Sequence, residues 1–158
     1  MEKIRIKNLE EDVYYEKLDN GLEVYLYTKD DIYTNYVTFT TKYGSVYNDF
    51  VPIGESKIRS FPKGIAHFLE HKVFEDENGQ DYLKKFVHLG SESNAFTSFT
   101  KTSYLFSTTS KVTENIQLLL EMVSKASFTE KSVSKEREII QQEIGMYQDS
   151  PDYRLFFG

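Results

Sequence analysis

Two of the three histidines in this 158-residue chain lie four positions apart, in the run His67-Phe68-Leu69-Glu70-His71. Four residues make slightly more than one turn of α-helix, so a helix places both imidazoles on one face, about 6 Å apart along its axis. Both rings can then reach one metal ion with nitrogen–metal distances of about 2.0–2.1 Å. The pattern therefore predicts a helix that carries two metal ligands, His67 and His71.

Glu70 lies between the two histidines, near the same helix face but rotated to one side. From there its carboxylate can take a proton from a water molecule at the metal and return it to a leaving amine. The order His-x-x-Glu-His is the inverse of the commoner His-Glu-x-x-His of metallopeptidases. We expect Glu70 to be a catalytic general base.

A catalytic zinc ion needs a third protein ligand and keeps its fourth position open. The segment from Thr129 to Gln148 is predicted to be a helix and carries four glutamates: Glu130, Glu136, Glu138 and Glu143. Glu136 and Glu143 are seven residues apart and share one face, whereas Glu138 points nearly the opposite way. These two suit a ligand and a carboxylate that holds a ligand in place, and their spacing does not say which is which.

The hydrophobic periodicity of the chain changes from two residues to about 3.6. Alternating segments flank Asn20-Gly21, a strong hairpin signal, and continue from Tyr33 to Tyr43. Residues 45–63 have the breakers of a loop. Helical spacing and capping residues then predict a helix from Gly64 and three more, over residues 81–90, 111–125 and 129–148, with strands within 93–107. This order predicts an α+β fold, mostly antiparallel sheet packed against helices.

Composition argues against several other classes of protein. Acidic residues outnumber basic ones 25 to 19, which argues against a nucleic-acid partner. The chain has no cysteine, so disulfides and thiolate metal sites are excluded. No apolar run suits a signal peptide or a membrane span. We therefore expect a cytoplasmic protein with no membrane partner.

The run GIAHFLEHKVFE at residues 64–75 resembles the active-site helix of the pitrilysin- and insulysin-type inverted-zincin metallopeptidases. KEREIIQQEI at residues 135–144 is similar to the second zinc helix of that family, in which two glutamates stand seven residues apart. The resemblance implies Zn²⁺ as cofactor, Glu143 as the third zinc ligand and Glu136 as the supporting carboxylate of the catalytic site.

The run SNAFTSFTKTSYLFS at residues 93–107 resembles the strand with which that family pairs an extended substrate. An unpaired strand edge near a metal can bind a peptide as an added strand, through backbone rather than side chains. We expect Asn94, Ala95 and Phe96 to bind substrate beside the scissile bond. The alternative is an ordinary buried hairpin.

Two features depart from the family pattern. Lys72 follows the second histidine where the family usually has an apolar residue, a change outside the metal set. Family members also build a chamber from two related halves, and this chain matches part of the first. The resemblance therefore implies that residues 1–158 are a single partial catalytic domain, completed by a second, C-terminal half or a partner subunit.

The leading functional prediction is a zinc endopeptidase that hydrolyses short, flexible peptides. One alternative is a non-catalytic partner subunit that only binds peptides, although such relatives typically lose a residue of the motif, and His67, Glu70 and His71 are all present. A second alternative is a structural metal site closed by a fourth donor, for which His88 is the remaining histidine.

Overall fold

The computed structural model describes residues 1–7 and 11–157, and the chain divides into two compact units, Met1–Tyr33 and Thr34–Gly158. The first unit is a three-stranded antiparallel sheet of β1 (Glu2–Ile6), β2 (Glu11–Lys17) and β3 (Glu23–Tyr27), in that order. Between β2 and β3 the chain turns at Gly21, with a φ of 86°, while the side chain of Asn20 accepts a hydrogen bond from the Leu22 amide. The Asn-Gly hairpin prediction is confirmed.

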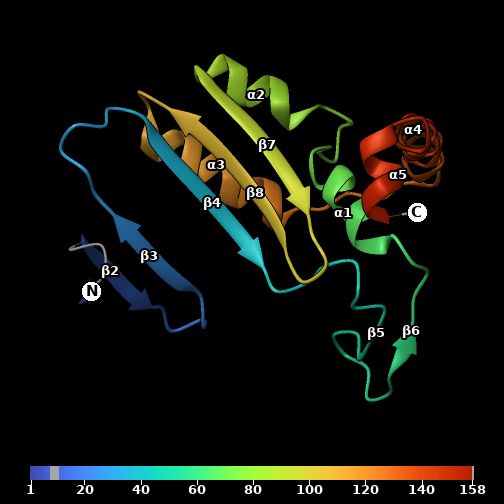
Figure 1. Ribbon diagram of the computed structural model, residues 1–158, viewed down its shortest axis with the longest axis horizontal. Helices are drawn as coiled ribbons and strands as arrows, with labels where there is room; N and C mark the ends of the chain where they lie inside the picture. The colour runs from blue at the N-terminus through green and yellow to red at the C-terminus, as the bar shows by residue number, and fades with distance from the viewer. Residues whose placement is uncertain (8–10, 158) are drawn as a thin grey trace. The chain divides into compact units, whose positions relative to one another are not determined.

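The second unit is built around another three-stranded antiparallel sheet, with strand order β4-β8-β7 (Figure 1). Its strands are β4 (Asn35–Thr41), β7 (Ser91–Thr97) and β8 (Thr102–Thr108). In the described part of the chain β7 pairs with β8 alone, so β7 is an edge strand. The segment predicted to be a loop also contains a short hairpin of β5 (Asp49–Phe50) and β6 (Arg59–Ser60).

Five helices accompany this sheet within the described residues: α1 (Ile65–Val73), α2 (Tyr82–His88), α3 (Val112–Ser124), α4 (Glu130–Gln148) and α5 (Pro151–Phe157). Asp81 caps α2 through the Leu83 amide, and Thr129 caps α4 through the Ser132 amide. The predicted α+β class and the first four helices are confirmed, whereas α5 has no counterpart in the prediction. No helix in the described ranges has the length and apolar character of a membrane span.

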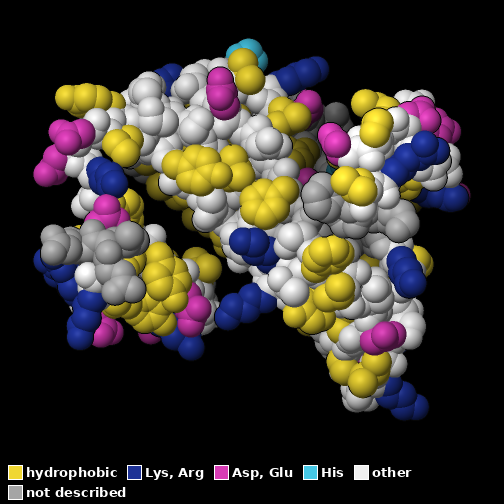
Figure 2. Space-filling model, in the orientation of Figure 1, with side chains coloured by type: hydrophobic (Ala, Val, Ile, Leu, Met, Phe, Trp, Pro, Cys, Tyr) yellow, Lys and Arg dark blue, Asp and Glu magenta, His cyan; other side chains and the backbone are white. Residues whose placement is uncertain are grey.

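Side chains of this sheet alternate between a covered and an exposed face. Helix α3 packs against β8 and β4, and α2 against β7. They cover a core that consists of Val73, Tyr82, Phe86, Tyr104, Phe106, Leu119 and Met122. On the opposite face Tyr36 and Phe96 are exposed, and Figure 2 shows hydrophobic side chains there. The alternation predicted for 33–43 therefore places Val37 and Phe39 against the core.

The buried face of α3 differs from the apolar stripe in its sequence. Ile116 and Leu120 are 36% and 41% exposed, whereas Asn115 is fully buried. Its side-chain amide donates to the Lys111 carbonyl and its side-chain oxygen accepts a hydrogen bond from the Ser91 hydroxyl. A polar residue that is hydrogen-bonded on both sides can occupy a core position at little cost, which rotates the helix away from its most apolar face.

Gly44 joins the end of β4 to the turn between β7 and β8. A Cβ at this position would lie 2.5 Å from the Ser98 carbonyl oxygen and 2.6 Å from the Lys101 nitrogen. The next amides, of Ser45 and Val46, donate to the carbonyls of Ser98 and Phe99. This close backbone approach secures the turn that follows β7.

We expect Gly44→Ala to lower the free energy of unfolding by about 1–3 kcal/mol, because the added methyl must displace backbone rather than a side chain. Urea denaturation followed by circular dichroism measures the change. Gly145→Ala is the matched control, since a Cβ there meets nothing within 4 Å and the residue is inside α4. That control should be about 1 kcal/mol more stable than the unmodified chain. Equal stability of the Gly44 variant and the unmodified chain would contradict the predicted clash.

Candidate metal centre

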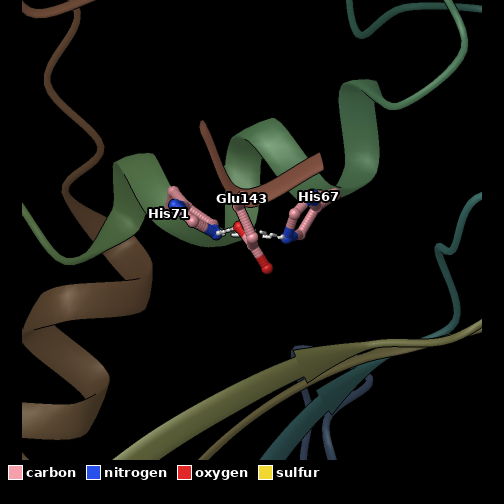
Figure 3. Close-up of side chains that lie close together, drawn as sticks. All are labelled: His67, His71 and Glu143. Carbon is pink, nitrogen blue, oxygen red and sulfur yellow. Dashed lines mark hydrogen bonds and ion pairs between the residues drawn. The ribbon is translucent and has the colours of Figure 1, made fainter. Parts of the chain in front are cut away.

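Three side chains from two helices converge on one point. Figure 3 shows His67 and His71 reaching from α1 and Glu143 from α4. The Nε2 atoms of the two histidines are 3.1 Å apart, and Oε2 of Glu143 lies 3.6 Å from His67 Nε2 and 3.4 Å from His71 Nε2. Within the described residues they are the group of donors placed closely enough to share a metal ion.

The separations of these donor atoms fit a zinc ion. A tetrahedral zinc with ligands at about 2.0–2.1 Å sets neighbouring ligand atoms about 3.3–3.4 Å apart. The three observed separations, 3.1, 3.4 and 3.6 Å, lie on either side of that value. Two imidazoles and one carboxylate are also the donor set of a catalytic zinc with one position left open. The residues present therefore suit this ion in both chemistry and spacing.

Glu136 orients one of the histidines from the other side. Its Oε1 lies 2.9 Å from Nδ1 of His71. A carboxylate accepts hydrogen bonds, so Nδ1 of His71 carries a hydrogen, which leaves Nε2 as the ring atom that could bind a metal ion beside His67 and Glu143. Such a carboxylate behind a histidine ligand fixes the ring and raises its basicity as a donor.

The positions of the glutamates follow from the register of α4 against α1, which pack together. Val133, Glu136, Ile140 and Glu143 are half-buried, and they recur at the spacing of one helix face. Glu130 and Glu138 are exposed on other faces of the helix. The spacing of the glutamates did not say which of them faces the metal donors. Packing decides this, because Glu143 faces both histidines and Glu136 faces His71 alone.

Glu70 is buried beside these donors but is not one of them. Its Oε2 accepts a hydrogen bond from the hydroxyl of Thr97, the last residue of β7. Burial, with a smaller contribution from the negative charge of Glu70, raises the pKa of the Tyr104 hydroxyl above its usual value. The carboxylate thus lies between the donor cluster and the covered face of the sheet.

A groove of about 450 Å³ lies beside Glu70 and reaches two residues of β7. Glu70, His71 and Glu136 line one part of it, and Asn94 and Ala95 line another. Phe96 is not among the lining residues, and its side chain is 42% exposed on the face of β7 that it shares with Asn94, opposite Ala95. The structure therefore brings Asn94 and Ala95, but not the side chain of Phe96, to the candidate site.

Several features of the site went unpredicted. Thr97 has the same strand parity as Ala95, a signal that points its side chain towards α1. Tyr147 follows Glu143 by four residues on α4, and its hydrogen bond to that carboxylate, followed by the charge of Glu143, raises the pKa of the tyrosine.

Two residues singled out in the sequence lie outside the donor group. Lys72 is fully buried, and its ammonium group pairs with Glu75, which also lines the groove. His88 is exposed at the end of α2. The unusual lysine therefore contacts the groove through Glu75, and the third histidine is not one of the three converging donors.

Comparison with known proteins agrees with this geometry. The chain is 52% identical over 155 residues to the uncharacterized zinc protease YmfH of Bacillus subtilis, covering 98% of this chain and 36% of that protein. The crystal structure of an M16-like peptidase from Alicyclobacillus acidocaldarius superposes with a TM-score of 0.86 at 37% identity, covering 97% of this chain and 35% of that one. A protease from Helicobacter pylori superposes with a TM-score of 0.76 at 27% identity, covering 93% of this chain and 34% of that one.

The chain thus spans about a third of the length of these relatives. The model of the family described as "Insulinase (Peptidase family M16)" matches residues 51–156. That region contains α1, α4 and the edge strand β7, and so every residue of the candidate site. Since the match covers well over half of the sequence, the chain belongs to the insulinase family of peptidases, family M16.

Proposed function

We propose that this chain carries the zinc site of an endopeptidase that hydrolyses short, flexible peptides. The observation that carries the proposal is the convergence of His67, His71 and Glu143 at zinc-ligand spacing, with the buried carboxylate of Glu70 beside them. A bound zinc ion would supply Lewis-acid polarisation and lower the pKa of water at the site. The names of the zinc proteases it resembles support the same chemistry.

In this proposal each side chain has a separate task. His67, His71 and Glu143 bind the ion, and Glu136 fixes the ring of His71 through Nδ1. Glu70 takes the proton of the attacking water and passes it to the leaving amine. Its burial beside the groove keeps this transfer away from bulk solvent.

The peptide would bind along the edge of β7, next to Asn94 and Ala95, which line the groove. Addition of a strand uses backbone hydrogen bonds, so this mode suits extended segments of many sequences. We further propose that a second, C-terminal half or partner subunit completes the substrate chamber. The relatives support this proposal, because their chains are about three times as long as the region matched here.

Metal removal tests the proposed activity. We expect a quenched-fluorescent peptide mixture to be cleaved by the zinc-loaded protein, cleavage to stop after treatment with a chelator, and activity to return with zinc but not with magnesium, which prefers oxygen ligands. The assay is run on this chain alone and on the chain mixed with the C-terminal part of the 52% identical relative. Cleavage by the mixture but not by the chain alone would support the proposal that a second half completes the substrate chamber.

Two outcomes would contradict the proposal. Cleavage that continues at an unchanged rate after complete metal removal would show that hydrolysis does not use this site. Stoichiometric zinc binding without cleavage in either preparation would instead favour the alternative of a non-catalytic, peptide-binding subunit.

A further inference from the structure

The Glu70 carboxylate and the hydroxyls of Thr97 and Thr102 lie in a row that leads from α1 into the fold. The Thr97 hydroxyl donates to Oε2 of Glu70 and lies 3.2 Å from the hydroxyl of Thr102, which donates to the Tyr43 carbonyl at 2.9 Å. Glu70 is 9% exposed and Thr102 3% exposed, so water has little access to replace these contacts. The general base of the proposed reaction is therefore bonded to the end of β7.

Two hydroxyl hydrogens serve these three contacts, and both can be assigned from simple valence. A carbonyl oxygen only accepts, so the hydroxyl hydrogen of Thr102 points to Tyr43. Thr97 also has one hydroxyl hydrogen, with Thr102 and the Glu70 carboxylate as its two acceptors. The charged carboxylate is the stronger acceptor, so Thr97 donates to Glu70. Thr102 then packs behind Thr97 and limits the rotation of its side chain.

From this arrangement we infer that Thr97 is a positioning residue, which holds Oε2 of Glu70 and so sets the plane of the carboxylate that takes up the proton. This inference rests on the proposed function. One oxygen is occupied by the threonine, which leaves proton transfer to the other oxygen. A buried carboxylate without such a donor would rotate about its terminal torsion, which has only broad preferences.

The same residue connects the base to the strand proposed to bind substrate. Thr97 closes β7 opposite Thr102, two residues beyond Ala95, which lines the groove. The turn that follows is held by amides of Ser45 and Val46. The backbone that would align the peptide and the hydroxyl that aligns Glu70 therefore belong to one rigid element, which fixes the distance between base and scissile bond.

Replacement of the hydroxyl tests this role. In Thr97→Val the side chain keeps its branched shape and strand preference but loses its donor. We expect kcat to fall about 10–100-fold, as for other groups that orient a catalytic residue, with KM and zinc affinity unchanged. Thr97→Ser keeps the hydroxyl and should recover most of the lost activity.

Ser103→Ala is the control for a purely structural effect. Ser103 lies on the neighbouring strand β8 and carries a buried hydroxyl, whose partner is the Thr40 hydroxyl, at 2.8 Å, and not Glu70. Removal of the Ser103 hydroxyl should lower the melting temperature of the protein without a selective loss of kcat. If Ser103→Ala lowers kcat as much as Thr97→Val does, the loss reflects general destabilisation and the inference is wrong.

A second measurement does not depend on peptide cleavage. With ¹³C-labelled glutamate carboxyls, the resonance of Glu70 is identified by its absence in Glu70→Gln. At fixed pH it should shift in Thr97→Val and stay in place in Thr97→Ser and Ser103→Ala. If the unmodified protein cleaves nothing, the proposed function fails and this resonance alone decides the role of Thr97. An unmoved resonance, or a moved one with unchanged kcat in an active enzyme, would overturn the inference.

Discussion

Zinc content should fall from about one ion per chain to nearly none when His67 and His71 are both replaced by alanine. Their Nε2 atoms are 3.1 Å apart and provide two of the three converging donors, so the variant keeps only the carboxylate of Glu143. One carboxylate on a helix surface binds zinc too weakly to retain it through purification. Elemental analysis of the purified, folded chains measures the difference.

His88→Ala is the matched control for this loss. It removes the remaining histidine of the chain, which is exposed at the end of α2 and is not one of the clustered donors. Its zinc content should equal that of the unmodified chain. Loss of zinc in His88→Ala would instead support a closed structural site with His88 as fourth ligand, and retention of zinc in the double variant would place the ion elsewhere.

Peptide cleavage should fall by about 10²–10⁴-fold or more in Glu70→Gln, with zinc still bound. The amide has nearly the shape of the carboxylate and can still accept the hydrogen bond of Thr97, but it cannot take up the proton of the attacking water. Parallel measurements of kcat and zinc content separate the two effects, because a general base contributes to the rate and not to metal binding.

Glu138→Gln controls for the loss of one negative charge, since this glutamate is exposed on a face of α4 away from the donors. Its rate should match that of the unmodified enzyme. Stoichiometric loss of zinc from Glu70→Gln would identify Glu70 as a ligand rather than a base. Undiminished cleavage by Glu70→Gln would show that another group moves the proton.

The limits of sequence-based prediction are clearest in elements with weak local signals. The N-terminal strand β1, the short β5–β6 hairpin and helix α5 were not predicted. The two strands of that hairpin are two residues each and show no usable periodicity. The burial of Asn115 on α3 could not be predicted, because it depends on a hydrogen bond from Ser91, 24 residues away, which no local pattern places near it.

Local periodicity was sufficient to predict which residues of the candidate site share a helix face. A spacing of four residues places His67 and His71 on one helix face, and a spacing of seven does the same for Glu136 and Glu143. These relations depend on the geometry of a single helix, so residue order alone determines them. The tasks assigned to the two glutamates came from a family resemblance and not from their spacing.

Contacts between elements depended on tertiary packing. The register of α4 against α1 directs Glu143 to both histidines and Glu136 to Nδ1 of His71. The approach of β7 to α1 brings Thr97 to Glu70. These residues are 27 to 76 positions distant from their partners, and no local spacing relates them. The sequence by itself thus determined which side chains share a helix face, whereas packing decided which faces meet, because that choice depends on how the whole core excludes water.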